Sequence, residues 1–166
     1  LPNAWIEQAL EATGTASIRR RRLPAEQVVW LVIALAIYRR QSMPEVLATL
    51  DLALSAASAQ AVSKSAVTQA RQRLGAKPLA QLFDQTARAW CQQDAEYRAW
   101  QGLSLWAMDG TTFRTPDSTN NRAHFGAQAY ASGKVASYPQ VRAVSITAIP
   151  THLVSDIAFG TYAQNE

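Results

Sequence analysis

The sequence predicts an α+β protein in which an all-helical part precedes a strand-rich part. Residues 1–100 are rich in Ala, Leu, Gln and Arg, whereas residues 101–166 are rich in Gly, Thr, Ser and Val with alternating apolar positions. The charge divides at the same place: 12 Lys and Arg face 8 Asp and Glu in the first part, and the second part has four of each. We therefore expect one domain over 1–100 and another over 101–166.

Composition narrows the class of protein further. A chain of 166 residues can bury one good hydrophobic core or two small ones. Its net charge of +4 favours an anionic partner, and its single cysteine, Cys91, excludes an internal disulfide framework and a cysteine-based zinc site. The absence of a signal peptide predicts a cytoplasmic protein. Because the sequence starts at Leu1 and not at Met, we expect it to be a piece of a longer protein.

The first quarter of the chain is expected to form two helices. The first covers residues 3–13 and is ended by Gly14. The second covers residues 25–40 and follows Pro24, a residue that suits the first turn of a helix. The apolar run in this second helix, residues 28–37, is about half as long as the ~20 residues that a membrane span needs. We therefore expect the buried central helix of a small bundle and no membrane partner.

Two of the later helices are marked by their first residues. The stretch 42–54 opens with Ser42 and has Glu45 three positions later, which is the spacing of a capping box. Pro78 begins a long amphipathic stretch that extends toward residue 100. Both stretches are predicted to be helices of the first domain.

A further helix, in the stretch VSKSAVTQARQRLG, is strongly basic. It has Ser63 or Ser65 as its N-cap and Gly75 as its stop, and it contains no acidic residue. Such a composition is typical of the recognition helix of a helix-turn-helix, with the helix in 44–54 as its support. The alternative is a solvated basic helix on the surface of a bundle, and this stretch alone does not decide between them. The residues expected to contact double-stranded DNA are Lys64, Ser65, Thr68, Gln69, Arg71, Gln72, Arg73 and Lys77.

The second basic element is a run of four arginines, Arg19, Arg20, Arg21 and Arg22. Four adjacent like charges repel one another unless water or a polyanion relieves them. A contact with the DNA backbone would do so, and that contact should weaken steeply with salt. The alternative is a solvated linker between two helices. Two separate arginine-rich elements in one small domain favour a nucleic-acid partner.

The stretch LSLWAMDG opens the second domain and poses a question about Asp109. Period-two alternation places Leu103, Leu105, Ala107 and Asp109 on one face of a strand, so Asp109 is expected to follow a buried row and to emerge at the strand end. A carboxylate held there can bind Mg²⁺, which usually needs more than one carboxylate. However, Asp-Gly is also the strongest short signal for a hairpin turn. On local grounds alone, the turn is the favoured interpretation.

The downstream pattern predicts two more strands. QVRAVSITAI alternates regularly, Pro150 interrupts it, and HLVSDIAFG follows as an antiparallel partner across a tight turn. In the long loop before them, Asp117 is expected to be a turn or cap residue, and Arg122 with His124 is expected to organise the loop by hydrogen bonds. A sheet that begins in this way, with an acid on its first strand, resembles the mixed sheet of the ribonuclease H-like fold.

Taken together, these phrases resemble the DDE transposases of the insertion-sequence-four family. RRRRLPAEQVVWLVIALAIYRRQSMPEVL and SAVTQARQRLG resemble the N-terminal helical domain of that family. LWAMDGTTFRTPDSTNNRAHFG and YPQVRAVSITAIPTHLVSDIAFGTY resemble the first three strands of its ribonuclease H-like catalytic domain. The order and spacing of these phrases make the resemblance specific, and it runs almost from end to end. It implies an enzyme of the bacterial nucleoid that binds the ends of an insertion element.

The resemblance also implies a role for Asp109. The Asp of the Asp-Gly-Thr stretch is the first of three metal-binding acids in the family, and Asp109 matches it. Two divalent ions, Mg²⁺ (or Mn²⁺), roughly 3.5–4 Å apart, activate the attacking water or DNA 3′-hydroxyl and stabilise the leaving oxygen. Asp109 is thus the expected catalytic and metal-binding residue, and a homodimer is expected in the full-length synaptic complex.

The chain departs from the family pattern after its third strand. It ends before the second Asp and the Glu near a Tyr-Arg-Glu-Lys signature, and neither Asp117, Asp156 nor Glu166 matches those positions. We therefore expect this piece to bind DNA without cleaving it and to hold no tightly bound metal. One alternative is a non-catalytic DNA-binding module, such as a truncated transposase or a transposition inhibitor. Another is a helical interaction domain with no nucleic-acid partner.

Overall fold

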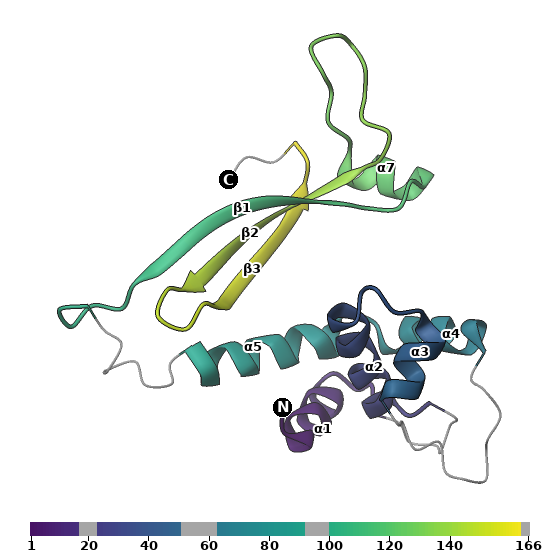
Figure 1. Cartoon of the computed structure of the whole chain (residues 1–166), viewed down its shortest axis with the longest axis vertical. Coiled ribbons are helices and arrows are strands. Elements are labelled where there is room, and N and C mark those ends of the chain that lie inside the picture. Colours follow the sequence, from purple (N-terminus) through teal and green to yellow (C-terminus); the bar gives the residue numbers. More distant parts are fainter. Residues whose placement is uncertain (17–22, 51–62, 92–99, 164–166) are drawn as a thin grey trace. The chain divides into compact units, whose positions relative to one another are not determined.

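The computed structural model describes residues 1–16, 23–50, 63–91 and 100–163. Helices come first in the chain and a three-stranded sheet follows, so the predicted α+β class is confirmed (Figure 1). The chain divides into two compact units, Leu1–Gln85 and Thr86–Glu166.

The helices of the first unit occupy the stretches that the sequence predicts. The bounds are α1 Asn3–Ala12, α2 Ala25–Ile37, α3 Met43–Thr49 and α4 Lys64–Leu74, and α5 Lys77–Cys91 begins in the first unit and ends in the second. The second helix is three residues shorter than expected because its capping residue, Tyr38, leaves the helical conformation. The expected continuation of α5 toward residue 100 lies outside the described residues.

The apolar helix α2 is the centre of the first unit. It packs against α1, α3 and α4, and Leu31, at its middle, is completely buried. Its partners bury Ile6 and Leu10 from α1, Val46 from α3 and Val67 from α4. The prediction of a buried central helix is therefore confirmed. In the part of the chain that the structure describes, no helix has the length and apolar character that would let it cross a membrane.

The predicted helix caps form as hydrogen bonds. The Ser42 N–H donates to Glu45 Oε2 at 2.6 Å, and hydrogen bonds from Ser42 lower the pKa of the Glu45 carboxyl. Of the two serines considered for α4, Ser63 is the cap, because its hydroxyl accepts from the Ala66 N–H at 3.2 Å. Gly75 ends α4 with a φ of 67°, a value that glycine adopts without steric cost.

The second unit is built on an antiparallel meander. Its strands are β1 Trp106–Arg114, β2 Gln140–Ala148 and β3 Leu153–Thr161, and they lie in the order β1-β2-β3. The tight turn predicted between β2 and β3 is present, with His152 at a φ of 58°. All strand pairs in the described residues are antiparallel, so the mixed sheet of the sequence analysis stays a prediction.

One helix of the second unit is missed by the sequence analysis, which assigns its residues to a loop. This helix, α7 Thr119–Phe125, is capped by Ser118, whose hydroxyl accepts from the Asn121 N–H at 3.2 Å. A helix of seven residues is too short for a periodic apolar pattern to be read from sequence. Its C-terminal end is tied to the strand region by backbone bonds, from the Gln140 N–H to Gly126 O and from the Tyr162 N–H to Phe125 O.

The position of Asp109 differs from both local interpretations. The first strand begins at Trp106 and continues to Arg114, so Asp109 lies within the strand, opposite Ser145, and Asp109-Gly110 is not a turn. Nine consecutive pairs with β2 hold this segment extended, which outweighs the local turn preference. Leu103 and Leu105 precede the strand and are 59% and 36% exposed, so the expected buried row is also wrong.

The first prediction concerns the core of the helical unit. Replacing Leu31 by Ala should destabilise this unit by about 2–5 kcal/mol, because the side chain is fully buried and leaves a cavity. Ile37→Ala on the same helix is the matched control, since Ile37 is 68% exposed and its truncation should change the unfolding free energy by less than about 0.5 kcal/mol. Urea unfolding of both variants measures the difference. Equal unfolding free energies would contradict the central role of α2.

Candidate nucleic-acid interface

Helix α4 has one buried face and one exposed cationic face. Val67, Ala70 and Leu74 recur at helical spacing and are buried. The principal helix that supports them is α2, because α4 packs against α2. The remaining side chains of α4 therefore point to solvent. These exposed residues are Lys64, Ser65, Thr68, Gln69, Arg71, Gln72 and Arg73, and Lys77 at the start of α5 is exposed as well.

Within residues 1–16, 23–50, 63–91 and 100–163, no acid compensates the charge of this face. The helix contains no acidic residue, and in the described parts of the chain none of Lys64, Arg71, Arg73 and Lys77 forms an ion pair. Two of the polar residues are already engaged: Thr68 Oγ1 donates to Lys64 O at 3.0 Å, and the Ser65 hydroxyl lies 3.1 Å from that of Ser63. The cations and the two glutamines, Gln69 and Gln72, thus remain the groups best placed to meet a ligand.

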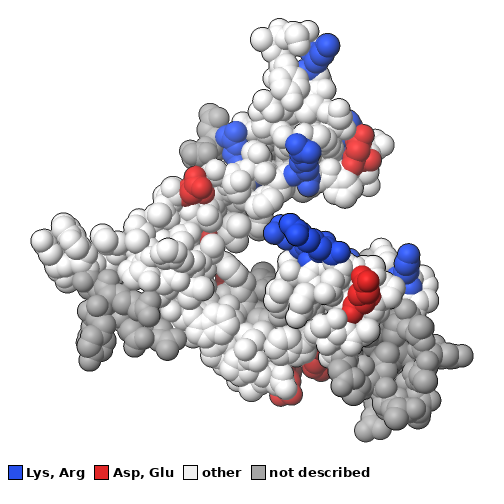
Figure 2. All heavy atoms as spheres, viewed as in Figure 1, with Lys and Arg blue, Asp and Glu red and all other residues white. Residues whose placement is uncertain are grey.

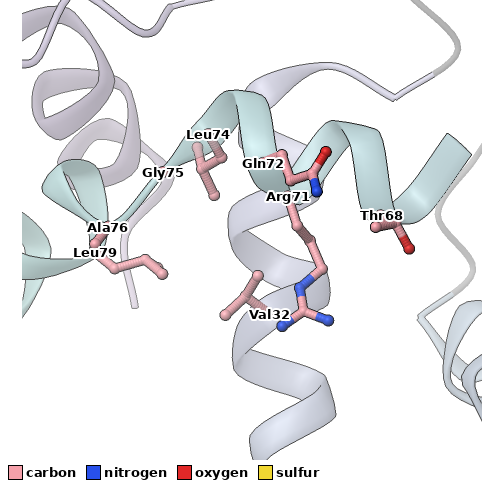
Figure 3. A pocket seen from close by; sticks show the side chains of 8 residues that line it. All are labelled: Val32, Thr68, Arg71, Gln72, Leu74, Gly75, Ala76 and Leu79. Atoms are coloured by element: carbon pink, nitrogen blue, oxygen red, sulfur yellow. The ribbon is translucent and has the colours of Figure 1, made fainter. Parts of the chain in front are cut away.

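A pocket of about 460 Å³ lies beside this face, between α4, the turn into α5 and α2. Arg71 extends from α4 toward Val32 of α2, and Leu74 and Leu79 supply much of the apolar lining (Figure 3). The methylene stem of an arginine covers apolar surface while its guanidinium stays in water. Arg71 is thereby held along the groove between the two helices.

The support of α4 differs from the predicted helix-turn-helix. The helix in 44–54 is the predicted support, but α3 packs mainly against α2, and α2 packs against α4. The segment between α3 and α4 is also longer than the 3–4 residues typical of that motif. The reason is the apolar character of α2, which buries the inner faces of both neighbours.

The first unit has two other basic elements, and the structure describes one of them. The run Arg19 to Arg22 lies outside the described residues, so its DNA contact stays a prediction. Arg39 and Arg40 are not among the predicted DNA contacts, and they are exposed in the turn after α2. Their adjacency in the sequence, directly after the apolar run, is the signal that points to them.

The side chains near Asp109 decide whether the described residues can form a metal site. Asp109 is exposed and pairs with Ser145 on β2, and Ile157 of β3 lies beyond Ser145. Within the described ranges, no three His, Cys, Asp or Glu side chains gather where they could hold a metal. Mg²⁺ prefers oxygen ligands and usually takes one or two carboxylates. Asp109 therefore suits one ligand position, and the described residues do not complete a site.

The other strand-borne acid does not join Asp109. Asp156 pairs with Ile146, and Ile146 pairs with Met108 of β1, so Asp156 and Met108 share one face of the sheet. Asp109 follows Met108 and lies on the opposite face. The two carboxylates therefore lie on different faces of the sheet, and the expectation that Asp156 has no metal role stays a prediction.

The loop after β1 is organised by an ion pair, as predicted for Arg122. Arg122 Nε donates to Asp117 Oδ1 at 2.5 Å, and Arg122 Nη2 donates to Ser137 O at 2.8 Å. The hydrogen bond from Arg122 lowers the pKa of the Asp117 carboxyl, and its positive charge adds to this effect. Asp117 thus anchors α7. His124 instead packs edge-on against Phe125, with ring centroids 4.7 Å apart.

An exposed cationic helix on a small helical unit is typical of proteins that bind nucleic acid, and comparisons with known proteins define the class further. A family model for the N-terminal part of the insertion element 4 transposases matches residues 1–84. The chain belongs to the insertion element 4 transposase family. No solved structure matches it.

Two relatives come from Escherichia coli (strain K12). The chain is 38% identical to "Transposase InsG for insertion sequence element IS4" over 161 residues, which are 97% of this chain and 36% of that protein. It is 35% identical to "Putative transposase InsZ" over 167 residues, which are 100% of this chain and 54% of that protein. The chain therefore spans between about a third and about half of the length of these relatives.

The second prediction concerns the ion pair that anchors α7. Arg122→Ala should raise the pKa of Asp117 toward the ordinary value of about 3.9, because the charged hydrogen-bond donor is gone. A lowered native pKa stabilises the fold above the unfolded-state pKa, and this contribution disappears as the pH falls through the native pKa. Titration of the Asp117 carboxyl carbon by NMR measures both values. Arg88→Ala is the control and should leave the Asp117 pKa unchanged.

Proposed function

We propose that this chain is the DNA-binding front part of an insertion-element transposase. Its ligand is the double-stranded DNA at the ends of the element, and α4 is the helix that meets it. The observation that carries the proposal is the cationic face of α4, which pairs with no acid among the described residues and is held outward by the burial of Val67, Ala70 and Leu74 against α2. Membership of the transposase family supports DNA as the polyanion.

The chemistry of the exposed face of α4 suggests separate roles for its cations and its glutamines. Lys64, Arg73 and Lys77 place positive charge where phosphate oxygens can approach, and such contacts set the register of the protein on the duplex. Gln69 and Gln72 carry amides that can pair with the N6 and N7 atoms of adenine in the major groove. Arg71 can act in either role, and its stem is supported by the groove beside α2.

The metal chemistry belongs to the longer transposase. Asp109 supplies one carboxylate to a site for Mg²⁺ (or Mn²⁺), and the other ligands come from transposase residues beyond this chain. When bound, the metal ions supply charge stabilisation to phosphoryl transfer at the DNA ends. This chain contributes the position of the carboxylate. Residues of β1 before and after Asp109 pair with β2, so Asp109 lies in the middle of a rigid element.

A second candidate function is a non-catalytic DNA-binding module. It is favoured by the single carboxylate at the Asp109 position, since the described residues complete no metal site. A protein of this kind would occupy the element ends without cutting them and so inhibit transposition. Both candidates require DNA binding by α4, whereas a helical interaction domain does not.

The third prediction tests DNA binding by the chain. Fluorescence anisotropy with a duplex of the element's terminal sequence should show an affinity that falls with salt. Arg71→Ala with Arg73→Ala should reduce the steepness of log K against log[salt] by about 0.9 for each phosphate that these arginines neutralise. Gln69→Ala or Gln72→Ala should reduce discrimination against a scrambled duplex, by about 1–3 kcal/mol for a bidentate contact. Arg88→Ala, an exposed cation of α5, is the matched control.

A drop in affinity that is the same for the α4 variants and the Arg88 control would contradict this assignment. Binding that is absent in the wild-type chain at low salt would favour the helical interaction domain.

The fourth prediction concerns Asp109 in the longer transposase. Asp109→Asn should reduce strand cleavage to background and leave DNA binding intact, because the substitution removes one metal ligand and leaves α4 unchanged. Asp156→Asn is the matched control, since Asp156 is a strand carboxylate on the opposite face of the sheet. A gel assay for nicked DNA with Mg²⁺ measures cleavage. Full cleavage by the Asp109 variant would remove Asp109 from the metal site.

A further inference from the structure

One face of the sheet carries Asp109 together with three hydroxyl side chains. Every second residue of a strand points to the same face, and residues opposite each other in a ladder share it. The hydroxyl residues around Asp109 on its face are Thr111 of β1 and Ser145 and Thr147 of β2. White spheres, which are residues other than Lys, Arg, Asp and Glu, cover most of the second unit in Figure 2. Among the strand residues of this face, Asp109 is the one charged group, and its polar neighbours are hydroxyls.

Ser145 is the hydroxyl residue nearest to Asp109. The two residues are directly opposite each other on β1 and β2. Residues in this position have Cβ atoms roughly 4.5–5.5 Å apart, whereas a diagonal neighbour such as Thr147 lies roughly 7–8 Å away. Thr111, two residues along β1, is also roughly 7 Å away. Rotation of the two side chains can therefore bring Ser145 Oγ and an Asp109 carboxylate oxygen to the distance of about 2.5–3.0 Å that an O–H···O hydrogen bond requires.

The hydroxyl of Ser145 is not engaged elsewhere in the described part of the chain. Neither this hydroxyl nor the Asp109 carboxylate forms a side-chain hydrogen bond or an ion pair with a described residue. On its other side, Ser145 is opposite Ile157 of β3, which has no side-chain acceptor. Of the two residues opposite Ser145, Asp109 is therefore the one that can accept a hydrogen bond from its hydroxyl.

The other serine of the three strands is used differently. Ser155 lies where the register between β2 and β3 shifts, and its hydroxyl donates to Ile146 O at 3.1 Å. This bond stabilises the irregular part of the ladder. The Ser155 hydroxyl is thus part of the local structure, whereas the Ser145 hydroxyl is available to a charged neighbour.

A hydrogen bond to a metal-ligating carboxylate has a defined effect. It holds the carboxylate in one orientation, and partners of this kind contribute about 10–100-fold to metal affinity or activity. A serine hydroxyl has a single proton to donate, so it engages one carboxylate oxygen and leaves the other free. The hydroxyl also carries no charge that would repel a cation.

We propose that Ser145 is a positioning residue for Asp109 in the metal site of the longer transposase. Its hydroxyl donates to one carboxylate oxygen of Asp109 and so leaves the other oxygen to bind the metal ion. The inference rests on the proposed function, because it takes Asp109 as a metal ligand, and it adds a residue that is not among the predicted site residues. Ser145 is suited to this role because β2 is the central strand, and pairing with both neighbours holds its backbone.

The fifth prediction tests Ser145 in the longer transposase. Ser145→Ala and Ser145→Val should lower the affinity for Mn²⁺, measured by electron paramagnetic resonance, by about 10–100-fold. The Mg²⁺ concentration needed for half-maximal nicking should rise in the same proportion. Ser145→Thr should retain the wild-type affinity, because Thr has nearly the shape of Val and keeps the hydroxyl.

A stability measurement distinguishes positioning from a structural role. The Ser145 variants should keep the wild-type urea midpoint, since the hydroxyl has no other partner among the described residues. Ser155→Ala is the matched control. It should lower the urea midpoint and leave the Mn²⁺ affinity unchanged, because its hydroxyl bonds to Ile146 O.

Asp109→Asn in the same assays separates this inference from the proposed function. Loss of Mn²⁺ binding in the Asp109 variant, beside wild-type affinity in Ser145→Ala and Ser145→Val, would overturn only this inference. Equal loss of affinity in Ser145→Thr and Ser145→Val would also overturn it, since the hydroxyl would not be the group responsible. A lower urea midpoint of Ser145→Ala with unchanged affinity would assign Ser145 a structural role instead. Wild-type Mn²⁺ affinity in the Asp109 variant would overturn the metal role of Asp109 and this inference with it.

Discussion

The helical unit depends on the burial of α2. This helix is apolar around most of its circumference, so it is stable only when neighbours cover it, and α1, α3 and α4 supply that cover. Leu31 of α2 and Val67 of α4 are both fully buried in this core. The burial of each such side chain contributes about 1.5–3 kcal/mol. Everything exposed on the unit, including the cationic face, takes its orientation from this packing.

The orientation of α4 follows directly from that constraint. A helix with three buried positions at helical spacing has its rotation about its own axis fixed, and the residues between those positions must face water. In α4 those residues are cations, glutamines and hydroxyls. The backbone that carries the exposed face is therefore held by the core beneath it. A backbone held in this way limits the entropic cost of binding, which suits a surface that docks against a groove of fixed shape.

The sheet also fixes the positions of exposed side chains, but it does so by backbone pairing between strands. Backbone pairing along nine residues of β1 fixes the position of Asp109 and also places Arg114 beside Arg142. The alternation of side chains then places the Asp109 carboxylate and the two arginines on opposite faces of the sheet. One ladder thus fixes the face on which each of these charged side chains lies.

The sequence by itself determined the helices of the first unit, the caps at Ser42 and Gly75, and the three strands, because these depend on local periodicity and on hydrogen bonds between near neighbours. Between Ser63 and Ser65 as the cap of α4, the structure decided for Ser63. Only the tertiary structure decided which helix supports α4 and whether Asp109 lies in a turn or a strand, because partners distant in the chain compete with local preference and win.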